Sequence, residues 1–207
     1  MNVTLIAHTP LSVCSHAVRT CWDSFDKGGD YNEATDNIIE ADKELINRIG
    51  NKMKHTSVKN HVNYNFTIQG ITTKTLLALT RHDVGTEFSV QSTRYTTKKS
   101  VAKGTAGYTL SKSDLVNKYL EDIDTMILQC VKNGEANDEI SLLLPQAWQY
   151  NLMATFSLGA LQHFLKLRLK PDAHWDIREL AKKLYEAIPE EHRYLFEECL
   201  YIEKTGI

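Results

Sequence analysis

The sequence has little of what marks extended, secreted or membrane proteins. Only 4 of its 207 residues are proline and 10 are glycine, while 42% are hydrophobic, which predicts a globular chain with a proper core rather than a linker or a tail. It lacks any run of about 20 apolar residues that could span a membrane. The opening MNVTLIAHTPLSV lacks the basic start and the long apolar run of a signal peptide. We therefore expect a cytoplasmic protein that has no membrane partner.

An excess of one charge and closely paired cysteines are lacking as well. The chain has 24 Lys+Arg and 26 Asp+Glu, so it does not have the positive excess of a protein that coats nucleic acid polymers. None of its four cysteines forms a C-x-x-C pair, and no Cys/His cluster has the spacing of a zinc site. We expect free thiols in a reducing compartment and no metal site.

The periodicity of apolar residues predicts a helix-rich chain with a small sheet. The clearest strand spans 62–69, where apolar and polar residues alternate, and Gly70 is expected to end it. A shorter strand is expected at 3–7, and 88–95 is expected to be extended or irregular. Helical spacing predicts helices at 11–25, 34–53, 73–82, 111–134, 146–168, 174–188 and 190–202.

Several of these helices carry signals for their ends or their surroundings. Ser12 or Ser15 is expected to cap the first helix, whereas Ser113 is expected to cap the helix at 111–134 and Gly134 to end it. The helix at 146–168 is apolar on more than one side, which predicts a central or subunit-buried helix. The predicted fold class is α/β (α+β), a helix-rich mixed fold with a small central sheet, in a single domain over residues 1–207.

Three polar clusters could carry chemistry: 55–61, 81–95 and 161–168. In the second, two arginines stand near several hydroxyl residues. The planar fork of an arginine matches a phosphate, and hydroxyls with backbone N–H groups can complete an anion site. A solvated polar loop explains the same residues, so the spacing alone leaves both readings open.

Arg168 and the histidines are also open to two readings. Arg168 ends a long apolar helix, and a buried arginine must be paired or hydrogen-bonded. Asp172, Asp176 or the helix C-terminus could satisfy it without any catalytic role. The histidines of the three clusters fit a core or surface role at least as well as a ligand role.

Taken in order, five blocks of the chain resemble the flavin-dependent thymidylate synthases. Their sequences are AVRTCWDSF (17–25), HTSVKNHVNYNF (55–66), RHDVGTEFSVQSTRY (81–95), SLGALQHFLKLR (157–168) and AHWDI (173–177). Each block alone is unspecific, but their order and spacing over nearly the whole chain are specific. The resemblance implies a mixed α/β homotetramer without a G-x-G-x-x-G fingerprint, with FAD bound between subunits. It also implies conversion of dUMP to dTMP with methylenetetrahydrofolate as the one-carbon donor and NADPH as the reductant.

The resemblance also implies roles for individual residues. Contacts to FAD are implied for Ser24, Ser57, Asn60, Arg81, His82 and His163. Contacts to the nucleotide are implied for Arg81, Gln91, Ser92, Thr93, Arg94 and Arg168. Arg168 is the implied catalytic residue, since a fixed guanidinium beside a ring that develops negative charge stabilises it electrostatically. Ser92 is expected to bind rather than to attack, because no adjacent base is evident to activate it. The redox chemistry belongs to the flavin.

The sequence departs from the family pattern at positions implied to bind the cofactor. Asp83 replaces the second arginine of R-H-R, Gly159 replaces the arginine of N-A-R, His163 replaces an asparagine and Asn60 replaces a glutamate. Each lost charge-assisted hydrogen bond weakens anion binding by roughly 1.5–3 kcal/mol unless another group replaces it.

Three functions therefore stay open at the level of sequence. The first is a synthase with altered FAD contacts. The second is a paralogue that modifies C5 of another pyrimidine deoxynucleotide, such as dCMP, or transfers a hydroxymethyl group. The third is a degenerate nucleotide-binding protein. A set of retained residues speaks against the third, namely Arg81, His82, Ser92, Arg94 and Arg168.

Overall fold

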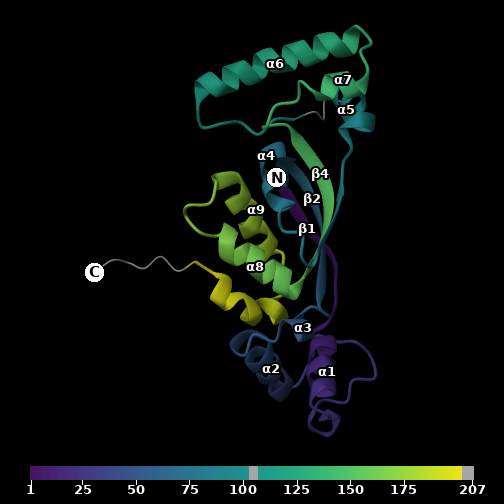
Figure 1. The fold of residues 1–207 in the computed structure, drawn as a ribbon, viewed down its shortest axis with the longest axis vertical. Helices are drawn as coiled ribbons and strands as arrows, with labels where there is room; N and C mark the ends of the chain where they lie inside the picture. The colour runs from purple at the N-terminus through teal and green to yellow at the C-terminus, as the bar shows by residue number, and fades with distance from the viewer. Residues whose placement is uncertain (103–106, 202–207) are drawn as a thin grey trace, which may run out of the picture. The chain divides into compact units, whose positions relative to one another are not determined.

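The computed structural model describes residues 1–102 and 107–201 and contains many helices and one four-stranded sheet (Figure 1). The strands are β1 (Asn2–His8), β2 (Asn63–Thr72), β3 (Thr86–Val90) and β4 (Gln149–Ser157). The helices are α1 (Leu11–Cys21), η1 (Phe25–Lys27), α2 (Glu40–Ile46), η2 (Asn47–Lys52), α3 (Thr56–Lys59), α4 (Thr73–Leu79), α5 (Thr93–Ala102), α6 (Asp114–Lys132), α7 (Asn137–Ser141), α8 (Leu158–Arg168), α9 (Trp175–Glu186) and η3 (Glu190–Cys199). The predicted helix-rich α+β class is confirmed. Among the described residues, no helix is both long and apolar enough to cross a membrane.

The sheet has the order β1-β2-β4-β3, so the long strands β2 and β4 are its centre. Its neighbouring strands are antiparallel, and backbone bonds at the strand ends set their register: Thr9 N–H to Asn63 O, Leu158 N–H to Val62 O and Gln91 N–H to Asn151 O. The side chains of Tyr64, Phe66 and Ile68 on β2 are fully buried, as their alternation predicts.

The chain divides into two compact units, each built from several segments. Unit 1 contains Met1–Asn2, Ile68–Arg81 and Phe88–Met153; unit 2 contains Val3–Thr67, His82–Glu87 and the described residues from Ala154 onward. The expectation of a single domain stays a prediction.

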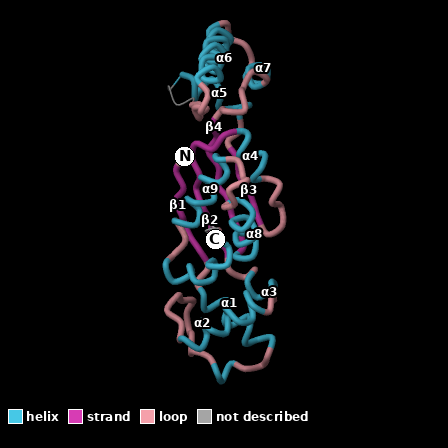
Figure 2. The backbone as a smooth tube through the Cα atoms, turned by 90° about the vertical axis from the view of Figure 1, so that its left-hand side faces the viewer, coloured by secondary structure: helices cyan, strands magenta, loops and turns pink. Residues whose placement is uncertain are grey.

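The core of unit 2 is aromatic and lies between the sheet and the helices α8 and α9, which cover one of its faces (Figures 1 and 2). Phe156 of β4 is fully buried and packs against Phe66 with ring centroids 6.2 Å apart and against Phe164 of α8 at 5.8 Å. These contacts fix α8 on the sheet and with it the arginine at the end of that helix.

The core of unit 1 is built by Ile127 of α6, Ile140 of α7 and Trp148. The helix α6 begins and ends as predicted, because the Ser113 side chain accepts a hydrogen bond from Val116 N–H and Gly134 follows with φ +81°. Only part of the apolar side of α6 is buried. Leu120 and Ile127 are buried, whereas Leu115 and Met126 are exposed.

The prediction of one helix over 146–168 is wrong, because its first half is the central strand β4. Leu152, Ala154 and Phe156 are buried and alternate with more exposed residues, which is the period of a strand. The helix starts only at Leu158, where the Ser157 side chain accepts from Ala160 N–H as the N-cap. The apolar character on several sides thus comes from a strand inside the sheet, and it no longer indicates a subunit-buried helix.

The prediction of a helix over 34–53 is wrong in its first part. The helix α2 starts at Glu40 and continues into the π-helical turn η2. Asp36 lies in the segment before it, where its carboxylate accepts a hydrogen bond from Leu11 N–H at 2.8 Å. A long-range contact therefore holds this segment outside the helix.

The predicted caps of the first helix are wrong as well. The residue at the N-cap of α1 is Pro10, and both serines lie inside the helix and are buried. Ser12 Oγ accepts from Thr35 N–H, while Ser15 Oγ donates to the carbonyl of Ser12. The two hydroxyls satisfy tertiary and local bonds instead of the helix end.

Three further boundaries differ from the predictions. β2 does not end at Gly70, which has φ +75°, but continues to Thr72. The segment 88–95 contains the end of β3 and then the first residues of α5, a helix that the sequence hides because it opens with residues of low helix propensity. The last predicted helix is the 3₁₀-helix η3, and Ile202 lies outside the described residues. The helices predicted at 73–82 and 174–188 are confirmed as α4 and α9, within a few residues.

Candidate active site

Arg168 and His82 form the best-defined polar contact among the predicted site residues. Arg168 is the last residue of α8, and its Nε donates to Nε2 of His82 at 3.2 Å. Because His82 Nε2 accepts this bond, the hydrogen-bond pattern assigns the imidazole as neutral, with its proton on Nδ1. The contact holds the guanidinium in a defined position at the end of a well-packed helix.

The surroundings of His82 keep it uncharged. Its pKa is lowered to about 4, mainly by burial of the ring and further by the positive charge of Arg168 and by His163, while Asp83 opposes the shift. His163 of α8 lies edge-on at 5.8 Å between ring centroids, and Phe164 lies at 5.0 Å. His82 is therefore a neutral hydrogen-bonding group at pH 7 that positions Arg168, rather than a proton donor.

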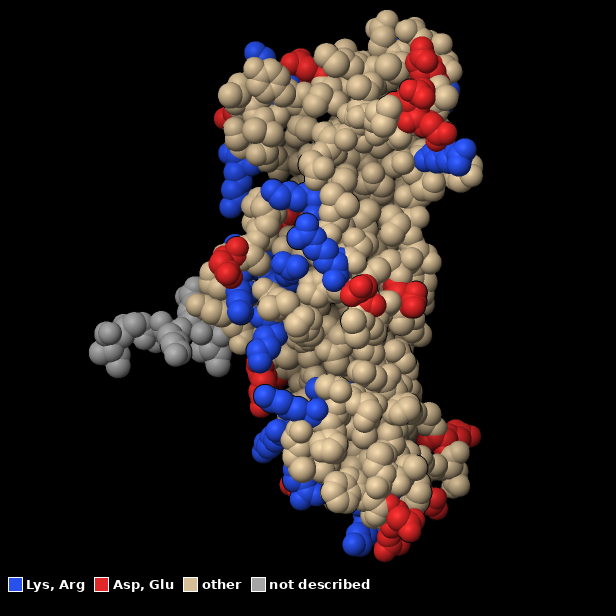
Figure 3. Space-filling model, viewed as in Figure 1, with Lys and Arg blue, Asp and Glu red and all other residues tan. Residues whose placement is uncertain are grey.

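The surface of unit 2 at α8 and α9 is rich in positive charge. α9 carries Arg178, Lys182 and Lys183, and the last turn of α8 carries Lys166, which points away from Arg168 because residues two apart in a helix lie on opposite sides. Figure 3 shows Lys and Arg side chains gathered over the part of the surface that α8 and α9 cover in Figure 1. A basic face of this kind raises the local concentration of anionic ligands.

A cavity of about 420 Å³ lies beside α1 and α3 in the same unit. Ser57 lines it, as do the apolar side chains of Val13, Ala17 and Val58, and His61 adds a polar group. An apolar floor with a few polar groups suits the flat heteroaromatic part of a ligand. Of the predicted FAD contacts, Ser57 is the one that lines this cavity.

The predicted phosphate site lies in unit 1, at the start of α5. Ser92 precedes this helix, and Thr93 and Arg94 form its first turn. The first N–H groups of a helix lack partners within it and favour an anion. Gln91 fixes this segment, since its Nε2 donates to Thr96 Oγ1 at 3.1 Å and its Oε1 accepts from Asn151 N–H at 3.1 Å.

Arg94 is held loosely enough to exchange partners. Its Nε lies 3.4 Å from a carboxylate oxygen of Asp138, and both side chains are more than half exposed. Exposed ion pairs contribute little, about 0–1 kcal/mol. A phosphate that offers a bidentate contact would therefore compete well with Asp138 for this guanidinium.

The other predicted residues stand apart from these groups. Arg81 is exposed just after α4 and belongs to unit 1, while the neighbouring His82 belongs to unit 2. Ser24 lies in the turn after α1, where its backbone bonds to Arg19 and Lys27. The structure thus brings together His82, His163 and Arg168 in one unit, and Gln91 to Arg94 in the other.

Comparison with known proteins places this arrangement in a family. The family model described as thymidylate synthase complementing protein matches residues 4–192. The flavin-dependent thymidylate synthases of Campylobacter jejuni RM1221 and of Wolinella succinogenes are each 42% identical to the chain, over 97% of the chain and 98% of the relative. The chain belongs to the flavin-dependent thymidylate synthase family. A solved structure of thymidylate synthase X from Helicobacter pylori with FAD and dUMP matches with a TM-score of 0.83 and 31% identity, over 97% of this chain and 99% of that one.

Two departures from the pattern of flavin-dependent thymidylate synthases are neighbours in space. Asn60 accepts a hydrogen bond from Ser157 Oγ at 3.2 Å, and a Cβ added to Gly159 would lie 2.7 Å from Asn60 Oδ1. The sequence pattern of the family has a carboxylate at the first position and a guanidinium at the second. Both charges of that pattern are absent here, and the two positions lie side by side.

Sequence reasoning missed several residues that line the cavity beside α1. His16 and Thr20 line it from α1, and Cys21 completes that side of it. Their signal was available, since Val13, Ala17 and Thr20 or Cys21 recur at the three- and four-residue spacing that marks one helix face. What the sequence did not reveal is that this face borders a cavity.

Proposed function

We propose that this chain is a flavin-dependent thymidylate synthase that reductively methylates dUMP to dTMP with methylenetetrahydrofolate and NADPH. The observation that carries the proposal is the 42% identity to enzymes of that name over nearly the whole chain, together with a fixed Arg168 on a neutral His82. The solved Helicobacter pylori structures contain FAD and dUMP, which supports the same pair of ligands here.

The residues present fit a flavin nucleotide. The cavity lined by Ser57 has an apolar floor for a ring system. In this proposal Ser24, Ser57, Asn60, Arg81, His82 and His163 hold FAD. Once reduced by NADPH, the flavin supplies the electrons for the reductive methylation.

Arg168 carries the main electrostatic role toward the substrate. Its guanidinium is always charged, and the bond to His82 fixes its orientation before the pyrimidine arrives. A preorganised cation beside the ring stabilises the negative charge that develops when N3 ionises, without reorganisation during the reaction. His82 serves this role as a neutral acceptor, since a protonated imidazole would repel the guanidinium.

The phosphate of dUMP is assigned to Ser92, Thr93 and Arg94 at the start of α5. These residues combine helix N–H groups, two hydroxyls and one guanidinium that is only weakly paired. Gln91 positions them through its side-chain amide and is therefore a positioning residue of the proposed substrate site. Arg81, which precedes them in the sequence, adds a positive charge.

A homotetramer is proposed on a basis different from the helix at 146–168. The exposed side chains of Leu115, Tyr119 and Met126 recur on one face of α6 at helical spacing and are each more than half exposed. Exposed apolar faces of this kind mark protein interaction sites. A second copy of the chain is the occupant that the proposed activity requires, because FAD would bind between subunits. A cytoplasmic location stays a prediction.

The test is an absorption spectrum of the purified protein with and without FAD, followed by anaerobic mixing of the NADPH-reduced protein with folate and nucleotide. Flavin near one per chain, reoxidised only with methylenetetrahydrofolate and dUMP, supports the proposal. The same response with dCMP would support the paralogue, and failure to bind flavin would indicate a degenerate member.

A pair of variants ties this test to the proposed site. Arg168→Ala is expected to abolish turnover and to leave the fold and most FAD binding intact. Lys166→Ala removes a neighbouring positive charge from the same turn of α8 and is expected to retain most activity. Normal turnover of Arg168→Ala would refute the assignment of Arg168.

A further inference from the structure

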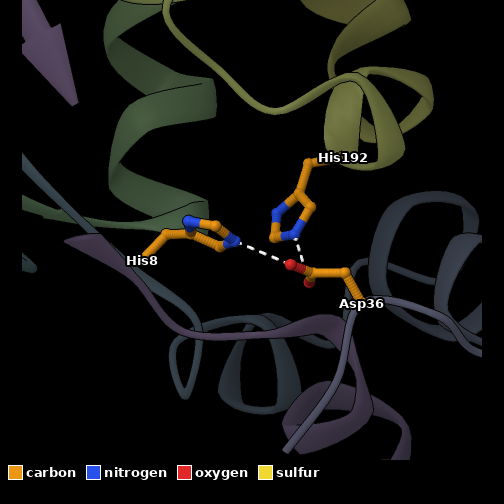
Figure 4. A group of neighbouring side chains, drawn as sticks. All are labelled: His8, Asp36 and His192. Carbon is orange, nitrogen blue, oxygen red and sulfur yellow. Dashed lines mark hydrogen bonds and ion pairs between the residues drawn. The ribbon is translucent and has the colours of Figure 1, made fainter. Parts of the chain in front are cut away.

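Two histidines and one aspartate, none of them assigned to the candidate active site, converge in unit 2 (Figure 4). His8 lies at the end of β1, Asp36 lies before α2, and His192 lies on η3. The Nε2 atom of His8 and the Nε2 atom of His192 each lie 2.7 Å from a different carboxylate oxygen of Asp36. The three ligand-type atoms all lie within 4.8 Å of one another.

We infer that His8, Asp36 and His192 form a binding site for a divalent transition-metal ion of the zinc type. Two imidazole nitrogens and one carboxylate oxygen are the donors that Zn²⁺ takes, and three protein ligands leave a fourth position for water. The separation of these residues by 28 and 156 positions explains why no spacing motif revealed the site.

The geometry needs only a small adjustment to accept the ion. Ligand atoms about 2.0–2.1 Å from a tetrahedral zinc ion lie about 3.3 Å from one another. The nitrogen–oxygen contact of 2.7 Å to the carboxylate oxygen that becomes the ligand must therefore open by about 0.6 Å, and the other histidine must turn from the second oxygen toward the same ion. The side chains of His8 and Asp36 are each 25% exposed, which leaves a path for the ion and room for this shift.

The buried side of the cluster already has the second layer of contacts that metal sites use. Nδ1 of His192 lies 2.7 Å from the hydroxyl of Tyr64, and both side chains are fully buried. With a metal on Nε2, the proton moves to Nδ1 and is donated to the Tyr64 oxygen, which fixes the ring.

A metal here would tie together three separate segments of unit 2. It would link the first strand, the segment that precedes α2 and the start of η3, which are far apart in sequence. Binding to the folded chain alone raises its stability by mass action. We therefore assign the site a structural role, independent of the flavin reaction.

The direct test uses the full chain after treatment with a chelator, titrated with Zn²⁺ and separately with Co²⁺ at neutral pH. We expect one ion per chain, visible Co²⁺ absorption bands of a tetrahedral nitrogen–oxygen site, and a rise in Tm on adding Zn²⁺. Binding that never exceeds that of the His8→Gln variant would overturn the proposal and leave a hydrogen-bonded triad only.

Variants distinguish a ligand from a residue that merely supports the fold. His8→Gln should weaken Zn²⁺ binding by at least about 100-fold, and Tyr64→Phe, which keeps the ring, by about 10–100-fold. His55→Gln removes an exposed histidine elsewhere and should bind as the unmodified chain does. Far-UV circular dichroism in chelator verifies the folding of each variant. Equal Zn²⁺ affinity in folded His8→Gln and His55→Gln would refute the site.

Discussion

Replacing Arg168 by glutamine should raise the pKa of His82. The guanidinium donates from Nε to His82 Nε2 at 3.2 Å, so the contact favours the neutral imidazole. Protonation of His82 would place two cations in contact and would destroy the acceptor. Glutamine keeps a side chain of moderate length and a donor but removes the charge.

The expected size of the change follows from the contributions to the pKa. Burial is the largest cause that lowers the pKa of His82 to about 4, and it persists in the variant. A hydrogen bond to a charged group contributes about 1.5–3 kcal/mol, and about 1.4 kcal/mol corresponds to one pKa unit. Because both side chains are only partly buried, water screens this interaction, and we expect a rise of about 1 unit. The pKa would then be near 5, still below that of a free histidine.

The assay is a pH titration of the His82 ring signals by NMR in the unmodified chain and in two variants. Lys166→Gln is the matched control, since it removes one positive charge from the same turn of α8. Lys166 is not among the groups that shift the pKa of His82. Its variant should therefore leave that pKa within about 0.3 units, where one unit corresponds to about 1.4 kcal/mol. An Arg168→Gln value equal to the control, or a lower one, would refute the reasoning.

The same group makes stability depend on pH. The unfolded chain binds a proton at His82 with a pKa of about 6.5, whereas the folded chain does so only at about 4. Between these values the unfolded state binds more protons, so the free energy of unfolding falls as pH falls from about 6.5 to about 4. We expect a discounted loss of about 1–2 kcal/mol from this group, measured by urea unfolding. In Arg168→Gln the folded-state pKa of His82 is higher, so the pH range over which the free energy of unfolding falls should end at a higher pH.

Three other outcomes are expected. Asp83→Arg should tighten FAD binding, because it restores a positive charge of the family pattern. Fluorescence titration measures the affinity for FAD, and an equal or weaker affinity would show that other residues of this site already compensate for the missing charge. Phe156→Ala should destabilise the chain by about 3–5 kcal/mol in urea, since it empties a fully buried aromatic site. Ser113→Ala should cost about 1 kcal/mol through loss of the cap on Val116 N–H, and an unchanged urea midpoint would contradict the cap's contribution.

Local patterns determined the elements whose signals agree with their surroundings. The alternation of β2 matches a strand with one buried face, and the cap at Ser113 with the glycine at 134 marks both ends of α6. These signals depend on neighbouring residues only, so a sequence contains them in full. The residues of the candidate site are predicted for a different reason, because the five family blocks carry them in order.

Long-range contacts decided the elements that the patterns misjudged. The sequence pattern predicts a helix at Asp36, yet the Asp36 carboxylate accepts a hydrogen bond from Leu11 N–H and contacts His8 and His192. The segment 149–157 is predicted to be helical because an apolar run is compatible with a buried helix and with a buried strand. Pairing with β2 and β3 on its two sides makes it the strand β4.

By itself, the sequence determined the fold class and the family, since these depend on composition, periodicity and ordered motifs, while the roles of the site residues stay a prediction. Only the tertiary structure decided that Arg168 rests on a neutral His82, that Asn60 and Gly159 are neighbours, and that two histidines meet on Asp36. Each of these contacts joins residues tens of positions apart or more. Packing alone sets such distances and the burial that shifts a pKa.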